Sequence, residues 1–216
     1  MPSKEISRYF DATAHRQTRD DLKLAVSLVE GDKTAIDCGC GAGSDIEFLR
    51  KNDFLVHAFD LEEESIARCR SRFKGDSKVL LSQASFSTFK YPVVTLIVAD
   101  ASLFFCPIQD FSEVWGKITH ALSPKGVFVG SFLGPEDTMA GPEYNKGVYW
   151  PDVLVFAKEQ VENLFNNYKI ELFTEHRTSG TSPDGQPHHW HIFSVVAKKK
   201  SNKVRRPMLN SDAAGL

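Results

Sequence analysis

The stretch TAIDCGCGAGSD, residues 34–45, places three glycines within five positions directly after a short apolar run. Glycine lets a backbone bend tightly and approach another molecule without a Cβ atom in the way. Cys38 precedes the first glycine and Cys40 lies between the first two. The stretch therefore raises two possibilities, a metal site and a loop that holds a small molecule.

Apolar runs typical of buried strands alternate with segments of helical period on both sides of this loop. We expect strands at residues 35–38, 54–60, 78–85, 93–100, 126–134, 169–176 and 189–199, and helices at 18–31, 44–52, 62–75, 110–122 and 158–167. Ser44 and Glu47 have the spacing of a capping box, which predicts where the helix after the loop begins.

This alternation favours parallel strands joined by helical crossovers, which gives an α/β fold. Only the last two strands lack a helix between them, since about ten residues, 177–186, connect them. We therefore predict a seven-stranded, mostly parallel sheet with an antiparallel last strand and helices on both faces.

Composition limits the possible classes of protein. The chain has 216 residues, a formal net charge of -2 and 42% hydrophobic residues, typical of one globular domain. We expect that domain at residues 1–198, with a helical cap at 1–30 and a basic, disordered tail at 199–216. No run reaches the ~18 apolar residues of a membrane span, and the N-terminus lacks a secretory apolar region. We expect reduced thiols, a cytoplasmic location, and neither a nucleic-acid nor a membrane partner.

The glycine loop departs from the dinucleotide-binding pattern G-x-G-x-x-G, because Ser44 stands where its last small residue should be. The pattern is D-x-G-x-G-x-G and begins at Asp37. A second acid, Asp60, ends the next expected strand and could accept both hydroxyls of a ribose. This spacing alone suits either a nicotinamide dinucleotide or another nucleoside cofactor.

Four segments in order resemble the motifs of the class I S-adenosylmethionine-dependent methyltransferases. They are AIDCGCGAG (35–43), HAFD (57–60), LIVADASLFF (96–105) and ALSPKGVFVGSF (121–132). FLGPEDTMAGPEY (132–144) and HHWHIFSVVAKK (188–199) are similar to small members labelled tellurite-resistance-like. The resemblance implies a Rossmann-like fold, S-adenosylmethionine as cofactor, S-adenosylhomocysteine as product, and a small-molecule methyl acceptor.

The resemblance also implies roles for individual residues. The methionine part of the cofactor would lie on Asp37 and the backbone of residues 38–41, which are Cys38, Gly39, Cys40 and Gly41. Asp60 would bind the ribose, and the adenine would lie near Leu61, Ser85 and Phe86. Asp100 and Ala101 would lie beneath the sulfonium. Tyr9 would help to cover the cofactor or pack within its helix.

The histidine-rich run HHWH, residues 188–191, begins the last strand. An antiparallel last strand starts at the edge where the parallel strands end, so this run should lie beside the cofactor. We expect His189 or His191 to act as general base if the acceptor needs one. We expect no metal site, since Cys38 and Cys40 are too close for usual zinc spacing and no second pair exists. A nicotinamide-dependent oxidoreductase and a non-catalytic cofactor-binding protein remain the alternatives.

Overall fold

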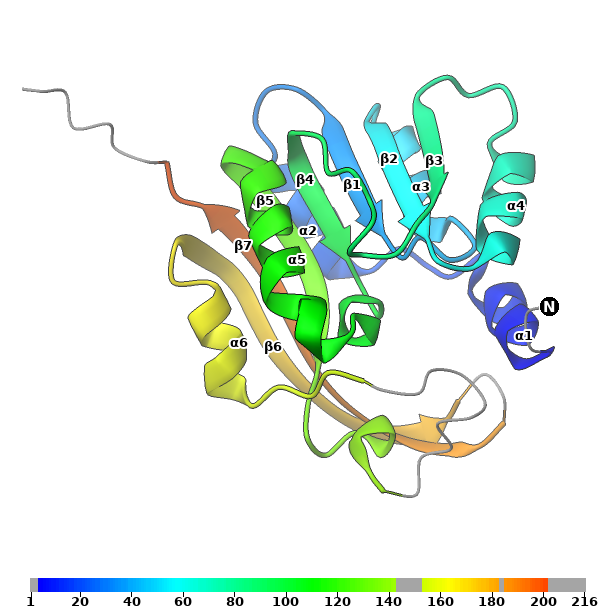
Figure 1. Ribbon diagram of the computed structural model, residues 1–216, viewed down its shortest axis with the longest axis vertical. Coiled ribbons are helices and arrows are strands. Elements are labelled where there is room, and N and C mark those ends of the chain that lie inside the picture. The colour runs from blue at the N-terminus through cyan, green and yellow to red at the C-terminus, as the bar shows by residue number, and fades with distance from the viewer. Residues whose placement is uncertain (1–3, 143–152, 183–184, 202–216) are drawn as a thin grey trace, which may run out of the picture.

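The computed structural model describes residues 4–142, 153–182 and 185–201. Its centre is a seven-stranded sheet with the order β3-β2-β1-β4-β5-β7-β6 (Figure 1). The strands are β1 (Thr34–Cys38), β2 (Leu55–Asp60), β3 (Val79–Gln83), β4 (Val94–Ala99), β5 (Leu122–Leu133), β6 (Tyr168–Thr181) and β7 (Pro187–Lys199). Strands β1 to β5 pair in parallel, and β7 is antiparallel to both of its neighbours. The predicted fold class is confirmed.

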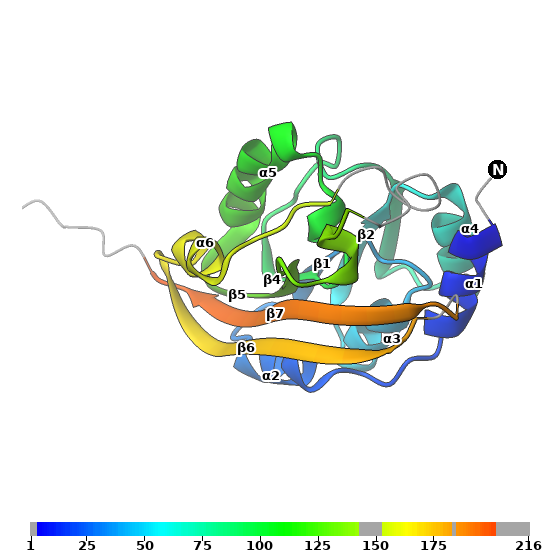
Figure 2. The ribbon, with the colours of Figure 1, turned by 90° about the horizontal axis from the view of Figure 1, so that it is seen from below.

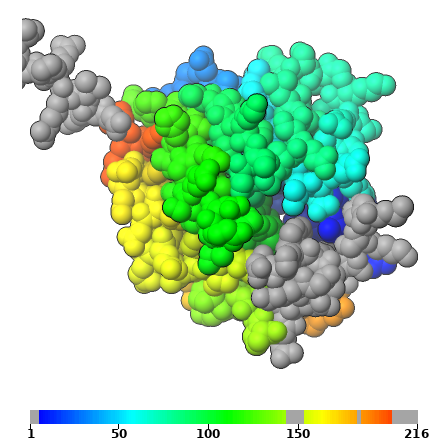
Figure 3. All heavy atoms as spheres, viewed as in Figure 1, coloured from blue at the N-terminus to red at the C-terminus, as the bar shows by residue number. Residues whose placement is uncertain are grey.

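Helices cover both faces of the sheet, and two apolar cores result. The helices are α1 (Lys4–Thr13), α2 (Asp20–Leu28), α3 (Ser44–Lys51), α4 (Glu63–Arg72), α5 (Ile108–Ala121) and α6 (Lys158–Leu164). One core joins the strands to α5 and α6, and the other joins them to α2, α3 and α4. Figure 2 shows these two layers in profile, and Figure 3 shows α5 in the middle of its face. No described helix has the length and apolar character needed to cross a membrane.

The strand order reverses direction between β1 and β4, which are neighbours in the sheet. From β1 the chain first builds outward through β2 and β3, and then crosses back to form β4 on the other side. Crossovers that leave in opposite directions open a crevice at the carboxyl ends of the two central strands. The glycine loop follows β1 and so lies at this crevice.

Two local predictions are wrong. Gly43, with φ 82°, is the N-cap residue of α3, and no side chain caps that helix. Ser44 Oγ instead accepts a hydrogen bond from Arg16 Nε at 3.1 Å, and Glu47 pairs with Lys51. The hairpin connection is also shorter than expected, because β6 continues to Thr181 and β7 begins at Pro187. The long hairpin carries its tip across the carboxyl edge of the sheet toward α1 (Figure 2).

Candidate active site

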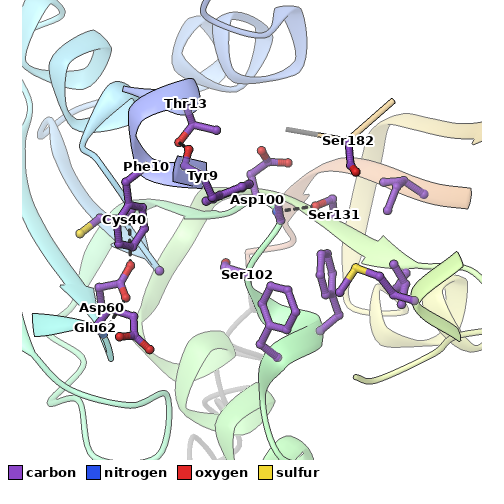
Figure 4. Close-up of a pocket in the computed structure, with 18 of the residues that line it drawn as sticks. Tyr9, Phe10, Thr13, Cys40, Asp60, Glu62, Asp100, Ser102, Ser131 and Ser182 are labelled. Atoms are coloured by element: carbon purple, nitrogen blue, oxygen red, sulfur yellow. Dashed lines mark hydrogen bonds between the residues drawn. The ribbon is translucent and has the colours of Figure 1, made fainter. Parts of the chain in front are cut away.

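A cleft of about 1090 Å³ lies at the carboxyl ends of the strands. Its walls come from α1, the glycine loop, the ends of β2 and β4, and the β6–β7 hairpin. Figure 4 shows Asp60 and Glu62 at one end of it, Ser182 at the other, and Ser102 and Ser131 between them. Small-molecule sites usually occupy ~300–1,000 Å³. The cleft is therefore large enough for more than one small molecule.

The glycine loop forms the floor of this cleft in a conformation that needs glycine. Gly39 has φ 71° and Gly41 has φ 51°, both in the left-handed region. A Cβ atom on Gly39 would lie 2.5 Å from Cβ of Ser102, so the loop after β4 packs directly on this glycine. Ser102 Oγ donates to the Cys38 carbonyl at 2.6 Å and fixes that contact. The predicted close approach of the backbone is therefore present, and Gly39, Cys40 and Gly41 all line the cleft.

The carboxylate of Asp60 links the end of β2 to the glycine loop. Its Oδ2 accepts a hydrogen bond from the Gly41 N–H at 2.8 Å, and its Oδ1 accepts from the Glu62 N–H at 3.0 Å. Burial raises the pKa of Asp60, while these N–H donors act in the opposite direction. Each carboxylate oxygen can accept more than one hydrogen bond, so Asp60 can still accept from a ligand in the cleft.

A partly buried cluster of charges lies beside the glycine loop, and its two arginines were not predicted. Arg19 contacts Asp100 at 2.8 Å and Asp45 at 3.0 Å, and Arg16 contacts the same two carboxylates at 3.2 and 3.1 Å. Burial alone would lower the pKa of Arg19, but Asp100 and Asp45 raise it, so this guanidinium stays charged. Arg16, Arg19 and Asp100 line the cleft. The Nη2 atom of Arg19 is buried and has no hydrogen-bond partner among the described residues.

Asp37 lies beneath the glycine loop and does not line the cleft. Its residue is 3% exposed, and its Oδ2 is a buried oxygen without a hydrogen-bond partner in the described part of the chain. Burial, and then the charge of Asp45, raises the pKa of Asp37 well above its usual value. Cys38 is fully buried beside it and contributes only its backbone. The structure thus holds one orphaned carboxylate oxygen and one orphaned guanidinium nitrogen near the same loop.

The far side of the Asp60 carboxylate is bordered by apolar groups. Leu61 lines the cleft although it is 61% exposed, and Phe86 lies opposite in the loop after β3. Phe86 is held by an edge-to-face contact with Phe59 at 5.3 Å between ring centroids. The hydroxyl of Ser85 is paired with Thr88 Oγ1 at 3.0 Å, so its side chain forms a local turn at the rim. Leu61, Ser85 and Phe86 thus all line the same cleft.

The turn after β4 is strained, and neighbouring strands hold it. Ala101 has φ 47°, a conformation that is unfavourable for a residue with a side chain. Its N–H donates to Ser131 Oγ at 2.7 Å, so β5 fixes the turn. Tyr9 of α1 closes the same region from above and lines the cleft (Figure 4). Burial raises the pKa of Tyr9, so its hydroxyl is neutral.

The histidines of β7 fall on two different faces of the strand. His188, Trp190 and Ile192 line the cleft, as every second residue of a strand should. His189 and His191 alternate with them and do not line it. His189 is half-buried and pairs with Ser179 Oγ at 2.9 Å.

Both ring nitrogens of His191 are used within the protein. Nδ1 accepts from the Glu136 N–H at 3.1 Å, and Nε2 lies 2.9 Å from Glu175 Oε1. A Cβ atom on Gly134 would lie 2.5 Å from the His191 ring, so the ring is also enclosed. The structure therefore brings neither of the two predicted bases into the cleft.

The cysteines form no metal site with other ligands. No group of three or more histidine, cysteine or acidic side chains gathers in metal-binding geometry among the described residues. All four cysteines are free and buried. Burial raises the pKa of Cys38, and a hydrogen bond with Cys69, followed by burial, raises that of Cys40. These thiols stay protonated, and Cys38 and Cys40 pack into the two apolar cores on opposite faces of the sheet.

Several cleft residues could not be singled out from the sequence. They are Arg16, Arg19, Glu62, Ser102, Ser131, Phe104, Phe105, Asp137, Met139 and His176. His188 belongs to the run 188–191, which was expected beside the cofactor. The strand period of two separates it from His189 and His191 but does not say which of them face the cleft. No comparable local pattern marks Arg16 or Arg19, whose position depends on how the segment before α2 folds back.

Comparison with known proteins finds a matching domain model and several curated relatives over part of the chain. The family model described as "Methyltransferase domain" matches residues 35–126. Carboxy-S-adenosyl-L-methionine synthase from Haemophilus ducreyi is 26% identical over 113 residues, which are 49% of this chain and 46% of that protein. The chain spans less than half the length of the curated relatives it matches, with shares of 31% to 47%.

Solved structures share the fold over most of the chain. TehB from Haemophilus influenzae has a TM-score of 0.71 at 14% identity, covering 90% of this chain and 67% of that one. The N-methyltransferase NodS from Bradyrhizobium japonicum, in complex with S-adenosyl-l-homocysteine, has a TM-score of 0.64 at 16% identity, covering 91% and 97%. The family model therefore identifies a methyltransferase domain at residues 35–126, and the solved structures show that the fold is shared over most of the chain.

Proposed function

We propose that this protein transfers a methyl group from S-adenosylmethionine to a small-molecule acceptor in the cleft. The cofactor would supply a methyl group on a positively charged sulfur, which leaves as a neutral thioether. The observation that carries the proposal is the pair of orphaned polar atoms at the glycine loop, Arg19 Nη2 and Asp37 Oδ2. The amino-acid end of this cofactor has a carboxylate and an ammonium group, which are complementary to them.

The amino-acid end would lie over the glycine loop. Arg19 Nη2 can donate to the carboxylate, and charge-assisted hydrogen bonds of this kind are stronger than neutral ones. Asp37 lies below the cleft wall and does not line the cleft. Its Oδ2 would accept a hydrogen bond from the ammonium group, either directly or through a bound water molecule. The left-handed turn at Gly39 leaves the floor of the loop free of side-chain atoms.

The adenosine end would lie toward Asp60. This carboxylate can accept from the ribose hydroxyls while it keeps its contact with the Gly41 N–H. Leu61 and Phe86 offer apolar surfaces on which the adenine can stack. The adenine ring would cover the exposed side chain of Leu61 and the ring of Phe86.

Residues at the middle of the cleft would position the reacting groups. Ala101 and Ser102 form the turn that Ser131 holds, and Tyr9 covers it from α1. Alignment of two reactants can contribute up to ~7–11 kcal/mol in the best intramolecular comparisons. The chain would therefore act mainly by orientation and by exclusion of water. The free, protonated thiols of this chain also fit the cytoplasm, where cysteines stay reduced.

The proposal is tested by a transfer assay with methyl-labelled S-adenosylmethionine and a panel of small thiols, phenols and amines. We expect labelled product and one equivalent of S-adenosylhomocysteine per methyl group transferred. The Arg19→Met variant should lose turnover, whereas Lys23→Met, an exposed cation in the same helical segment, should keep it. Release of S-adenosylhomocysteine without methylated product from any acceptor would contradict the proposal.

A further inference from the structure

His188 is the histidine of β7 that reaches the cleft. Its side chain is 13% exposed, so the ring is largely enclosed by the cleft walls. It faces Trp190 on the same side of the strand, with 4.7 Å between the ring centroids. Both residues lie in the half of the cleft away from Asp60, where the hairpin and the segment after β5 meet.

A buried carboxylate orients this imidazole. The side chain of Asp137 is fully buried, and its Oδ1 lies 3.1 Å from His188 Nε2. The same carboxylate accepts from the N–H groups of Met139 and His191, each at 2.9 Å. When this carboxylate is ionised it can only accept, so the contact favours the tautomer of His188 that carries its proton on Nε2. The other nitrogen, Nδ1, then has a lone pair and no hydrogen-bond partner among the described residues.

Apolar side chains form much of this half of the cleft. They are Phe104, Phe105, Leu133, Met139, Trp190 and Ile192, and the polar residues Thr138, His176, Ser182, Gln186 and Ser194 line the cleft beside them. The rings of Phe104 and Phe105 lie 4.6 Å apart and come from the short helix η1 (Leu103–Phe105), directly after the turn at Ala101. His188 thus offers a basic nitrogen beside an apolar wall of the cleft, next to the region proposed for the methyl group.

We propose that His188 is the general base of the reaction and that Asp137 is its positioning residue. This inference rests on the proposed function and specifies its acceptor: a small compound with an apolar body and a hydroxyl, thiol or N–H group. The acceptor heteroatom forms a bond to the methyl carbon, and the carbon–sulfur bond breaks with its electrons going to sulfur. The acceptor proton moves to Nδ1 of His188, and the buried carboxylate balances the positive charge of the ring.

The orientation of the imidazole is tested first, without turnover. We would record nitrogen-15 NMR spectra of the labelled full chain at alkaline pH, where free imidazole is neutral. The signals of His188, assigned by comparison with His188→Gln, should be those of a ring protonated at Nε2. A ring protonated at Nδ1 would overturn the proposal, because that nitrogen could not accept a proton.

The base role is tested with two pairs of acceptors, one with and one without a proton on the reacting atom. Benzyl mercaptan and phenol carry one on the reacting atom, whereas benzyl methyl sulfide and pyridine do not. We expect His188→Gln to lower kcat for the first pair by about 10²–10⁴-fold, the usual contribution of a general base, and to leave the second pair unchanged. Asp137→Asn should lower kcat for the first pair without a matching change in KM. His120→Gln, an exposed histidine of α5 outside the cleft, is the control.

Each other outcome has a defined meaning. Equal losses for both pairs of acceptors, or a loss with His189→Gln in place of His188→Gln, would overturn the role of His188. A wild-type protein that binds S-adenosylmethionine in a calorimeter but methylates neither benzyl mercaptan nor phenol would overturn the acceptor class. A wild-type protein that does not bind this cofactor would instead refute the proposed function, so the two failures are distinguishable.

Discussion

Asp60 Oδ2 accepts a hydrogen bond from the Gly41 N–H at 2.8 Å, which joins the end of β2 to the glycine loop. The two residues are separated by a helix and a strand in the sequence and meet at the carboxyl edge of the sheet. The contact places a carboxylate and a left-handed glycine on the same wall of the cleft. Changes to either residue should therefore affect the binding of a ligand there.

Asp60→Ala should weaken the binding of S-adenosylmethionine by about 1.5–3 kcal/mol, the usual value of a hydrogen bond to a charged group. The reason is the loss of the acceptor for the ribose hydroxyls. Isothermal titration calorimetry of the folded variant measures the change. Asp20→Ala removes a carboxylate at the exposed start of α2 and should leave the affinity unchanged. An unaltered affinity in Asp60→Ala would remove the ribose role.

Gly41→Val should abolish binding of the cofactor, because the new side chain would enter the cleft and strain a residue with φ 51°. Gly75→Val provides a matched control, since Gly75 has φ 85°, a Cβ atom on it would meet no atom within 4 Å, and it lies outside the cleft. Both variants should lose stability, measured by thermal denaturation. Only Gly41→Val should lose the heat of binding, and equal binding by the two would show that the ligand does not approach this loop.

Arg19→Met should weaken binding of S-adenosylhomocysteine but not of 5′-methylthioadenosine, which lacks the amino-acid end. The loss should be about 1.5–3 kcal/mol for the first ligand, since a charge-assisted contact disappears. 5′-Methylthioadenosine is the control for indirect effects, because Arg19→Met also breaks the ion pairs with Asp45 and Asp100. If both ligands weaken equally, the guanidinium supports the cleft without contacting the carboxylate.

Asp37→Asn should stabilise the ligand-free protein at neutral pH more than at acidic pH. Burial raises the pKa of Asp37 above that of an unfolded aspartate, so the folded state binds the proton more tightly. Stability of the wild type therefore falls as pH rises from about 4, the unfolded value, through the folded pKa. An asparagine at position 37 does not titrate in this range, so the variant escapes this loss of stability. The Tm difference between variant and wild type should grow between about pH 4 and pH 8, and a constant difference would contradict this account.

The parts of the fold and site that could be predicted are those that depend on local patterns. Strand alternation and the glycine loop are short-range signals, and the end of β2 places Asp60 at a defined edge once the strands are parallel. Leu61 and Phe86, which the family resemblance placed near the adenine, both line the cleft. The capping box at Ser44 failed because Arg16, distant in sequence, takes the serine hydroxyl.

The remaining site depends on tertiary contacts that no local pattern encodes. Arg16 and Arg19 reach Asp100 only because the segment between α1 and α2 folds over the sheet edge. Asp137 meets His188 because the chain after β5 turns back over β7, and neither residue marks that turn in sequence. The choice among the histidines also required the register of a strand that begins at Pro187, two residues earlier than predicted.

The most direct test of the central claim is a calorimetric titration of the wild-type chain with S-adenosylhomocysteine, S-adenosylmethionine, NAD and NADP, supported by thermal shift. At a ligand concentration 100 times Kd, specific binding stabilises the folded state by about 2.7 kcal/mol. We predict one site per chain for each of the two sulfur nucleosides, with a matching rise in Tm, and no heat or shift with NAD or NADP. Binding of NAD or NADP in their place, or no binding of any of the four ligands, would contradict the account.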